Sequence, residues 1–258
     1  MRPWIALVCG LMLLLSPAGA GAGPWPRDAG SWFIAPAVGL ETTRGTRLRI
    51  LELYGEYGLA PRITAATKLR FELPANDWRD GRAELDSTLR WHPRFTPLGL
   101  HLGLEAGLRA ELRRNPDPQE IDLFEDVFVE ENDLQPGLTA LARVHVGRSI
   151  ETVLGPGWAR VTLAMHRPID LNLERYYIVE DSRPSTELVA QVGIRPTEDW
   201  LGMLTVSAWR SQGDRALKVS PAIGRRLAPS REVVLELTAE PGRSRGTRGL
   251  TVALWQQF

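Results

Sequence analysis

Charged and imidazole side chains recur at every second position along several short apolar segments of this chain. Both signs of charge are present, so such a row can pair its charges internally or line a pathway for small charged or zwitterionic solutes. We take these residues as candidates for the lining of an interior. They are Lys68, Arg70, Glu72, Arg82, Glu84, Asp86, Arg90, His101, Glu105, Arg109, Arg143, His145, Arg160, Glu187, Lys218 and Glu236.

Two of the candidates, His101 and His145, are expected to lie on neighbouring strands, one step from Glu105 and Arg143. A metal-binding pair or a catalytic histidine is one interpretation of this group. A hydrogen-bond network of polar interior residues is the other, and we favour it. We therefore predict no metal site and no cofactor.

A hydrolase would need a nucleophile next to a base. Ser207 and Ser220 lie on the polar side of their segments, but no histidine is placed with them, and the sequence has no G-x-S-x-G motif. We predict that the protein is not an enzyme.

The segments that carry these residues alternate with a period of two. From Leu98 to Leu112, leucines and alanines alternate with glycines and charged residues, which a helix of period 3.6 does not explain. Twelve such segments are predicted between residues 31 and 258, and one of them ends at Val146 before a turn at 147–149. Pro36 and Pro221 fall inside segments, where a missing ladder donor disfavours a strand. Counts of ten and fourteen are alternatives.

The N-terminus has the features of a secretory signal peptide. Arg2 precedes an apolar run over 4–15, and small residues spaced A-x-A follow up to Ala22. We expect cleavage after Ala20 or Ala22, which removes Cys9 and leaves a mature chain without cysteine. The predicted organisation is a signal peptide over 1–22, a periplasmic N-terminal segment over 23–30 and a β-barrel over 31–258.

The last ten residues alternate between an apolar and a small or polar face and end on an aromatic residue. This resembles the terminal signature strand of bacterial outer-membrane β-barrels, which the barrel-assembly machinery reads. Gln256 departs from the pattern, since an apolar or aromatic residue is commoner there. The resemblance implies that Leu250, Val252, Leu254 and Phe258 form the assembly signal.

Segment 53–64 is similar to a strand–turn–strand repeat of small outer-membrane barrels, including putative channels of aromatic-degradation pathways. The resemblance implies a fold and a location in the outer membrane, but not a solute.

Short turns and longer connections alternate, as they do in bacterial barrels. The long connection over 113–133 is acidic, and we expect a solvated loop that cations bridge to lipopolysaccharide rather than a calcium site. Aromatic residues at the short-turn ends predict an interfacial girdle: Tyr57, Trp91, Phe95, Trp200 and Phe258.

The balance of positive and negative residues limits the classes of molecule that the protein is expected to bind. Lysine and arginine number 31, aspartate and glutamate also number 31, and this balance disfavours nucleic acid as a partner. We predict an all-β transmembrane up-and-down antiparallel barrel of about twelve strands, in contact with outer-membrane lipid and lipopolysaccharide. It is expected to act as a narrow channel for small solutes, or as a structural barrel with a charge-paired lumen.

Two alternatives stay open. One is an outer-membrane hydrolase acting on lipid or lipopolysaccharide, and the other is a secreted soluble β-sandwich whose apolar faces meet in a core. The barrel interpretation predicts that Leu104→Arg impairs insertion by about 2–4 kcal/mol, whereas Glu105→Gln has a milder effect.

Overall fold

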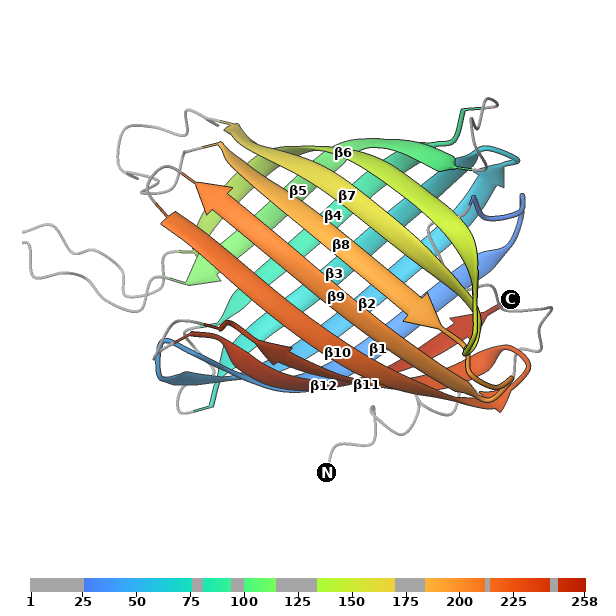
Figure 1. Cartoon of the computed structure of the whole chain (residues 1–258). Coiled ribbons are helices and arrows are strands. Elements are labelled where there is room, and N and C mark those ends of the chain that lie inside the picture. Colours follow the sequence, from blue (N-terminus) through green and yellow to red (C-terminus); the bar gives the residue numbers. More distant parts are fainter. Residues whose placement is uncertain are drawn as a thin grey trace, which may run out of the picture.

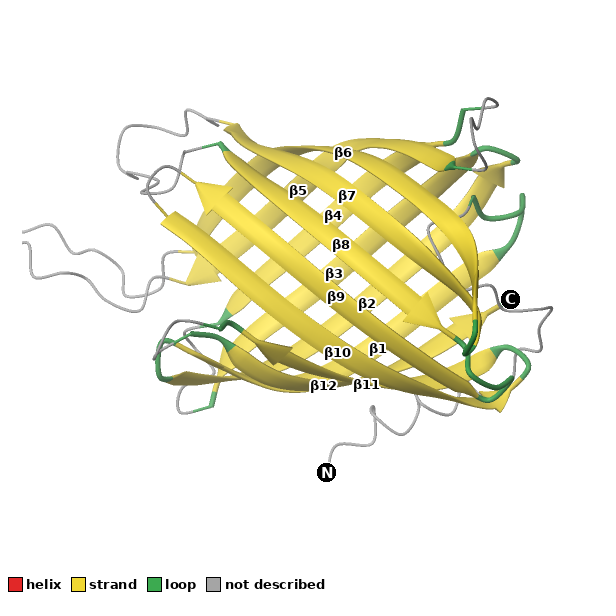
Figure 2. Ribbon diagram, viewed as in Figure 1, coloured by secondary structure: helices red, strands yellow, loops and turns green. Residues whose placement is uncertain are grey.

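Twelve antiparallel strands close into a barrel in the computed structural model (Figures 1 and 2). The structure describes residues 26–75, 81–93, 100–114, 134–169, 184–211, 214–241 and 246–258. The prediction of a closed all-β barrel of about twelve strands is confirmed. Among the described residues, no helix is long and apolar enough to cross a membrane.

The strands follow one another around the barrel in chain order, each paired with its sequence neighbours. They are β1 (Trp32–Thr43), β2 (Thr46–Ala60), β3 (Ile63–Pro74), β4 (Arg82–Trp91), β5 (His101–Arg114), β6 (Leu134–Thr152), β7 (Gly155–Ile169), β8 (Ser185–Ile194), β9 (Trp200–Ser211), β10 (Asp214–Ala228), β11 (Arg231–Ala239) and β12 (Arg248–Gln257).

The first and last strands close the barrel by pairing with each other. At the start of β1, the Trp32 amide donates to the Phe258 carbonyl at 3.1 Å, and the Phe258 amide donates back to the Trp32 carbonyl at 2.9 Å. Closure leaves no open sheet edge. A sheet exposed to lipid has to be closed, because unpaired backbone groups at an edge would have no hydrogen-bond partners there. We call the end of the barrel where β1 begins and β12 ends the terminal end, and the other the opposite end. The C-terminus lies at the right in Figure 1.

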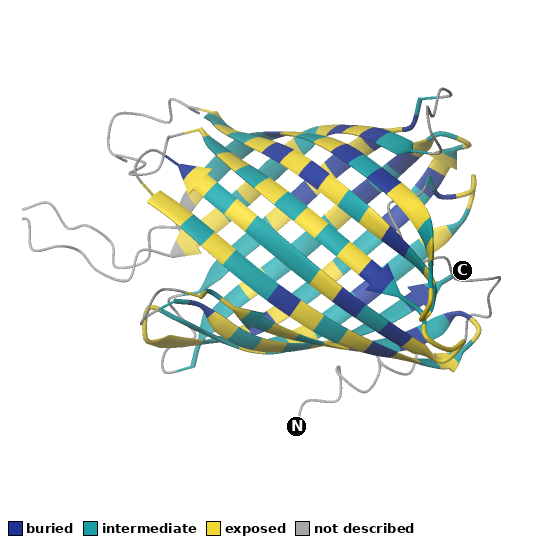
Figure 3. Ribbon diagram, viewed as in Figure 1, coloured by how far each residue is buried: buried dark blue, intermediate teal, exposed yellow. Residues whose placement is uncertain are grey.

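The two faces of the strands differ in how far their side chains are exposed. Figure 3 shows exposed and covered residues alternating along the ribbons. The exposed residues include a row of large apolar side chains on nearly every strand, such as Leu40, Leu104, Leu188 and Leu237, which are 65, 46, 48 and 53% exposed. The apolar rows therefore face outward around the whole barrel, and they do not meet in a core as a β-sandwich would require.

The predicted turn at 147–149 is wrong. Gly147 pairs with Arg160 and Ser149 pairs with Trp158, so β6 continues through this segment. The hairpin turns only at Val153 and Leu154, which project from its tip. Glycine and serine are common in turns, but here the pairing with β7 extends over them and overrides that local preference.

Pro36 and Pro221 both lie within strands, and the ladders show how each is accommodated. Pro36 pairs with Leu53 of β2, while the pairing of β1 with β12 is interrupted at that point. Pro221 likewise pairs with Leu204 of β9, and the pairing of β10 with β11 is interrupted. A strand residue directs its amide to one neighbour only, so the missing donor disturbs one ladder and leaves the other intact.

Candidate functional site: the charged interior

A continuous chain of ion pairs crosses the inner face of β2 to β6. It alternates in sign, and each consecutive pair of members is joined by a salt bridge. We call it the ion chain, and in order it consists of Arg27, Glu56, Arg90, Glu105, Arg143, Asp86 and Arg109.

Glu105 is the most deeply buried carboxylate of the ion chain. Its side chain is 1% exposed and accepts from Arg90 at 2.7 Å and from Arg143 at 2.5 Å. The strand register explains the contact, because Arg90 and Arg143 stand directly opposite Glu105 on β4 and β6. Charged residues directly opposite each other on neighbouring strands attract strongly where water is excluded.

Asp86 and Glu56 extend the ion chain on either side. Asp86 receives two hydrogen bonds from Arg109, at 2.7 and 3.0 Å, and one from Arg143 at 3.0 Å. Glu56 accepts from the Tyr54 hydroxyl at 2.6 Å and from Arg90 at 3.0 Å. Every carboxylate of the ion chain thus has at least two partners, which offsets the cost of removing its charge from water.

A second group of charges lies nearer the opposite end. Arg70 contacts Glu41 at 2.9 Å, Glu52 at 3.4 Å and Glu72 at 2.8 Å, so one guanidinium binds three carboxylates. Lys68 joins Glu52 at 3.0 Å. On β4 and β5, Arg82 pairs with Glu84 and Glu111, and Arg113 also pairs with Glu111.

The N-terminal segment reaches into the barrel at the terminal end. Arg27 is 7% exposed, its side chain donates to Glu56 at 2.5 Å, and its guanidinium lies 4.6 Å from the centre of the Phe33 ring. The segment is fixed next to β2, since the Gly30 amide donates to the Gly58 carbonyl at 2.8 Å. A β-carbon on Gly58 would lie 2.0 Å from the Asp28 carbonyl oxygen, so only glycine admits the segment here.

His145 forms a hydrogen-bonded row with residues on both sides. Its Nδ1 lies 2.9 Å from the Thr162 hydroxyl and its Nε2 lies 3.1 Å from Glu105. The order of hydroxyl, imidazole and carboxylate is that of a catalytic triad. However, Thr162 is 7% exposed in the middle of β7, its backbone is part of the sheet, and Glu105 is already bound by two arginines. We therefore assign the row to the ion chain's packing.

The other histidines are not gathered into one cluster. His101 stands opposite Gly147, one step nearer the terminal end than the pair formed by Gly103 and His145. The His92 Nδ1–H group donates to the Leu102 carbonyl at 3.2 Å. Within the described ranges, no group of three or more histidine, cysteine or acidic residues is arranged to hold a metal ion.

The inner face of β8 to β10, with the adjoining part of β7, has a different composition. Trp158, Leu201 and Met203 form a buried apolar cluster near the terminal end, with Ala222 and Trp255 packed against it. Farther along, polar uncharged residues take over: Gln191 donates to the Thr205 hydroxyl at 3.0 Å. Salt bridges at this side are Arg195–Glu232 at 2.6 Å and Lys218–Glu41 at 3.9 Å.

The remaining predicted candidates stand outside the ion chain. Glu187 faces inward on β8 without a salt bridge among the described residues, and Glu236 accepts a long hydrogen bond from Thr238 at 3.5 Å. Arg160 has a buried Nε without a hydrogen-bond partner among the described residues. The role of all these residues as a pathway lining stays a prediction.

Two ion-chain members, Arg27 and Glu56, were not among the candidates drawn from the sequence. Glu56 could have been found, because Glu52, Tyr54 and Glu56 share the polar face of one alternating segment. Arg27 precedes the first strand and has no periodic signal that would predict an interior position.

Ser207 and Ser220 are not brought together with a histidine among the described residues. The Ser220 hydroxyl lies 3.1 Å from that of Thr238, and no histidine side chain is bonded to either serine within the described residues. The acidic connection predicted to be a solvated loop lies largely outside the described residues.

Exposed aromatic residues lie at the terminal end, where the girdle is predicted. Trp32, Trp91 and Trp200 are 49, 49 and 42% exposed, and the Trp32 and Tyr57 rings lie 4.4 Å apart. Phe95 is outside the described residues.

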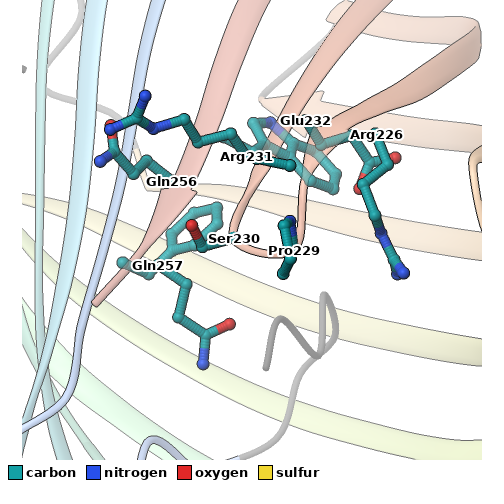
Figure 4. Close-up of a pocket in the computed structure, with 10 residues that line it drawn as sticks. Arg226, Pro229, Ser230, Arg231, Glu232, Gln256 and Gln257 are labelled. Carbon is teal, nitrogen blue, oxygen red and sulfur yellow. The ribbon is translucent and has the colours of Figure 1, made fainter. Parts of the chain in front are cut away.

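A small pocket at the terminal end explains the unusual Gln256. It is formed by the end of β12 and the turn between β10 and β11 (Figure 4). Gln256 is 3% exposed and is the register partner of Arg231, whose side chain extends toward the Gln256 amide (Figure 4). A polar residue at this position is therefore covered by a polar neighbour.

Comparison with known proteins identifies the fold. Neither the protein-family models nor the curated proteins give a match to this sequence. Among solved structures, an outer membrane channel from Pseudomonas putida F1 is similar with a TM-score of 0.58, at 12% identity over 93% of this chain and 100% of that one. The NanC porin gives 0.56, at 8% identity over 86% and 98%. The β domain of the Bordetella autotransporter BrkA gives 0.54, at 11% identity over 90% and 100%.

Proposed function

We propose that this protein is an outer-membrane channel of a Gram-negative bacterium, with a narrow lumen that admits small solutes. The observation that carries the proposal is a closed barrel whose inner charges become accessible to water toward one end. Side-chain exposure rises from 1% at Glu105 and 7% at Arg90 to 37% at Lys68 and 41% at Lys218.

The outer surface supports the location. Large apolar side chains that are 40–65% exposed on nearly every strand would be unfavourable in water and suit the hydrocarbon of a membrane. The exposed tryptophans at the terminal end suit the headgroup level. Lipid and lipopolysaccharide are then the surrounding partners, and the terminal strand is the element that the barrel-assembly machinery would read.

The interior supports a narrow rather than a wide passage. Eight strands leave an interior filled by side chains and 16–18 leave an open channel, so twelve strands are intermediate. At the terminal end, Arg27, Phe33 and Trp255 come together inside the barrel, with Phe33 and Trp255 ring centres 6.0 Å apart. We infer a lumen that is wide toward the opposite end and constricted toward the terminal end.

The test is single-channel recording with the mature chain refolded into planar bilayers. The proposal predicts discrete unitary conductance steps. A matched control is Leu104→Arg, which should insert poorly and reduce the number of steps without changing their size. Protein that is inserted, shown by protection from protease, but gives no steps would contradict the channel and leave a structural barrel.

The same preparation tests the rival function. Release of fatty acid from phospholipid vesicles or from lipopolysaccharide, at a rate that rises with protein concentration, would favour a hydrolase. A chain that stays monomeric in buffer without detergent would contradict the membrane location altogether.

A further inference from the structure

Among the described residues, Arg160 lacks the carboxylate partners that other inward-facing arginines have. Arg160 faces inward on β7, and its Nε is buried without a hydrogen-bond partner among the described residues. Those residues also place no carboxylate oxygen within 4 Å of it, whereas Arg90, Arg109 and Arg143 each bind at least two carboxylates.

Arg160 lies near carboxylates that other arginines already bind. It lies within electrostatic range of Glu56 and Glu105, and of Arg90. The ion chain holds four cations and three anions, and the 3.9 Å contact of Arg109 with Glu84 connects it to the salt bridges of Arg82 and Arg113 with Glu84 and Glu111. The connected network therefore has six cations and five anions. This network has no spare carboxylate for Arg160, which adds a further positive charge next to it. An uncompensated charge away from bulk water is costly, so this position favours an anion.

A second unsatisfied donor stands next to Arg160. Trp158 is two residues away on the same inner face of β7, at a spacing of about 6.6 Å between α-carbons. Its side chain is 6% exposed, and its indole Nε1 has no acceptor among the described residues. The indole nitrogen can only donate. Two buried N–H groups on one strand face therefore both require an acceptor.

The position of Trp158 is fixed by its neighbours. A β-carbon on Gly193 of β8 would lie 2.2 Å from the indole Cζ2, so the six-membered ring covers the glycine. Leu201 and Met203 complete the packing. The indole is held in place before any ligand arrives, which lowers the entropic cost of binding.

We propose that Arg160 and Trp158 form a lumen subsite for the carboxylate of a small organic anion. The two oxygens of a carboxylate supply acceptors to donors from both side chains, and its single negative charge balances the positive charge of Arg160. The inference that such anions cross the barrel rests on the proposed channel function, whereas their binding does not.

The test is a titration of the folded protein in detergent with sodium acetate, which replaces sodium chloride at constant total sodium. Tryptophan emission reports on Trp158, and Trp158→Phe should remove the change. The wild type should give a saturable change. Arg160→Gln should weaken acetate binding at least tenfold, and Arg160→Lys should give an intermediate loss because it keeps the charge but not the planar donor group.

The matched control is Arg167→Gln, which removes an exposed arginine from the same strand and should leave the titration unchanged. Circular dichroism and heat-modifiable mobility on gels establish that each variant is folded. If replacing chloride by acetate has no effect, but adding chloride from low salt gives a saturable change, the carboxylate assignment is overturned. If neither salt gives a change that depends on Arg160, the subsite itself is overturned.

Bilayer recordings separate this inference from the proposed function. With an acetate gradient, the reversal potential of the wild type should indicate preference for acetate over sodium, and Arg160→Gln should reduce that preference. Acetate binding without any conductance would contradict the channel and keep the subsite. Conductance with a selectivity that Arg160→Gln does not alter would keep the channel and overturn a role of the subsite in transport.

Discussion

The two sides of the barrel interior are built on different physical principles, although their outer faces are alike. The charged wall, which is the inner face of β2 to β6, is held by the ion chain and by the group around Arg70. The sparse wall, which is the inner face of β8 to β10, is filled by apolar side chains such as Leu201 and by polar uncharged ones such as Thr205. Leu104 on the outer face of one wall and Leu188 on the other are exposed to nearly the same extent.

This difference indicates what each wall contributes. Interlocked ion pairs fix the side chains of the charged wall, and nearly all of their charge is neutralised in place. The sparse wall offers few charges, so a solute there would meet hydroxyls, amides and apolar groups. Arg160 on β7 lies between the two walls and has no carboxylate partner among the described residues.

The largest effect is expected from Glu105→Gln in the charged wall. The change leaves the buried Arg90 guanidinium and the partly buried Arg143 guanidinium short of a carboxylate. We therefore expect a loss of about 3–5 kcal/mol in the free energy of unfolding, measured in urea with the protein folded in lipid. The control in the sparse wall is Glu187→Gln, which should change the stability by less than about 1 kcal/mol. Equal effects would mean that the ion chain does not stabilise the charged wall.

The expectation for Glu105 differs from that drawn from the sequence, in which Glu105→Gln is milder than Leu104→Arg. Alternation identifies Glu105 as inward but does not reveal that Arg90, Arg143 and His145 all converge on it. Its central position in the network reverses the predicted order.

The next largest effect is expected from arginine on the outer face, and there the two walls should agree. Leu104→Arg and Leu188→Arg should each lower the stability in a bilayer by about 2–4 kcal/mol if they lie near the midplane. The measurement is the equilibrium between folded and unfolded protein in lipid vesicles. A marked difference between the two variants would show that only one of these surfaces faces hydrocarbon.

A smaller effect is expected from Gly193→Ala, which tests packing at the edge of the sparse wall. The added methyl group would overlap the Trp158 ring, and we expect a loss of about 1–3 kcal/mol together with a shift in tryptophan emission. In Gly202→Ala the nearest atom is 3.6 Å away, so stability should change by less than about 0.5 kcal/mol. A neutral Gly193→Ala would show that the indole is loosely held.

The smallest effect on stability is expected from Arg27→Ala, because Glu56 retains Arg90 and Tyr54 as partners. We expect less than about 2 kcal/mol in unfolding but a larger unitary conductance, since the side chain occupies the lumen at the terminal end. Arg225→Ala is the control, because that arginine lies over the exposed Trp200 ring and not inside the barrel. An unchanged conductance in Arg27→Ala would place the constriction elsewhere.

The sequence by itself determined the strands, the two faces of each strand and the barrel class. These depend on a side-chain period of two, which is a local property that any strand carries along its own length. The segment over 98–112 shows this in its described part, because Leu104, Leu108 and Leu112 are exposed on the outer face as the alternation predicts.

The tertiary structure alone decided which inward residues meet. The partners of Glu105 follow from the register of β4, β5 and β6, the end of β6 follows from its pairing with β7, and the entry of Arg27 follows from the path of a segment without periodicity. Arg160 has the same alternation signal as Arg143, yet among the described residues only Arg143 of these two has a carboxylate partner. That difference depends on side chains brought together from different strands, so it could not be predicted from the alternation within one segment.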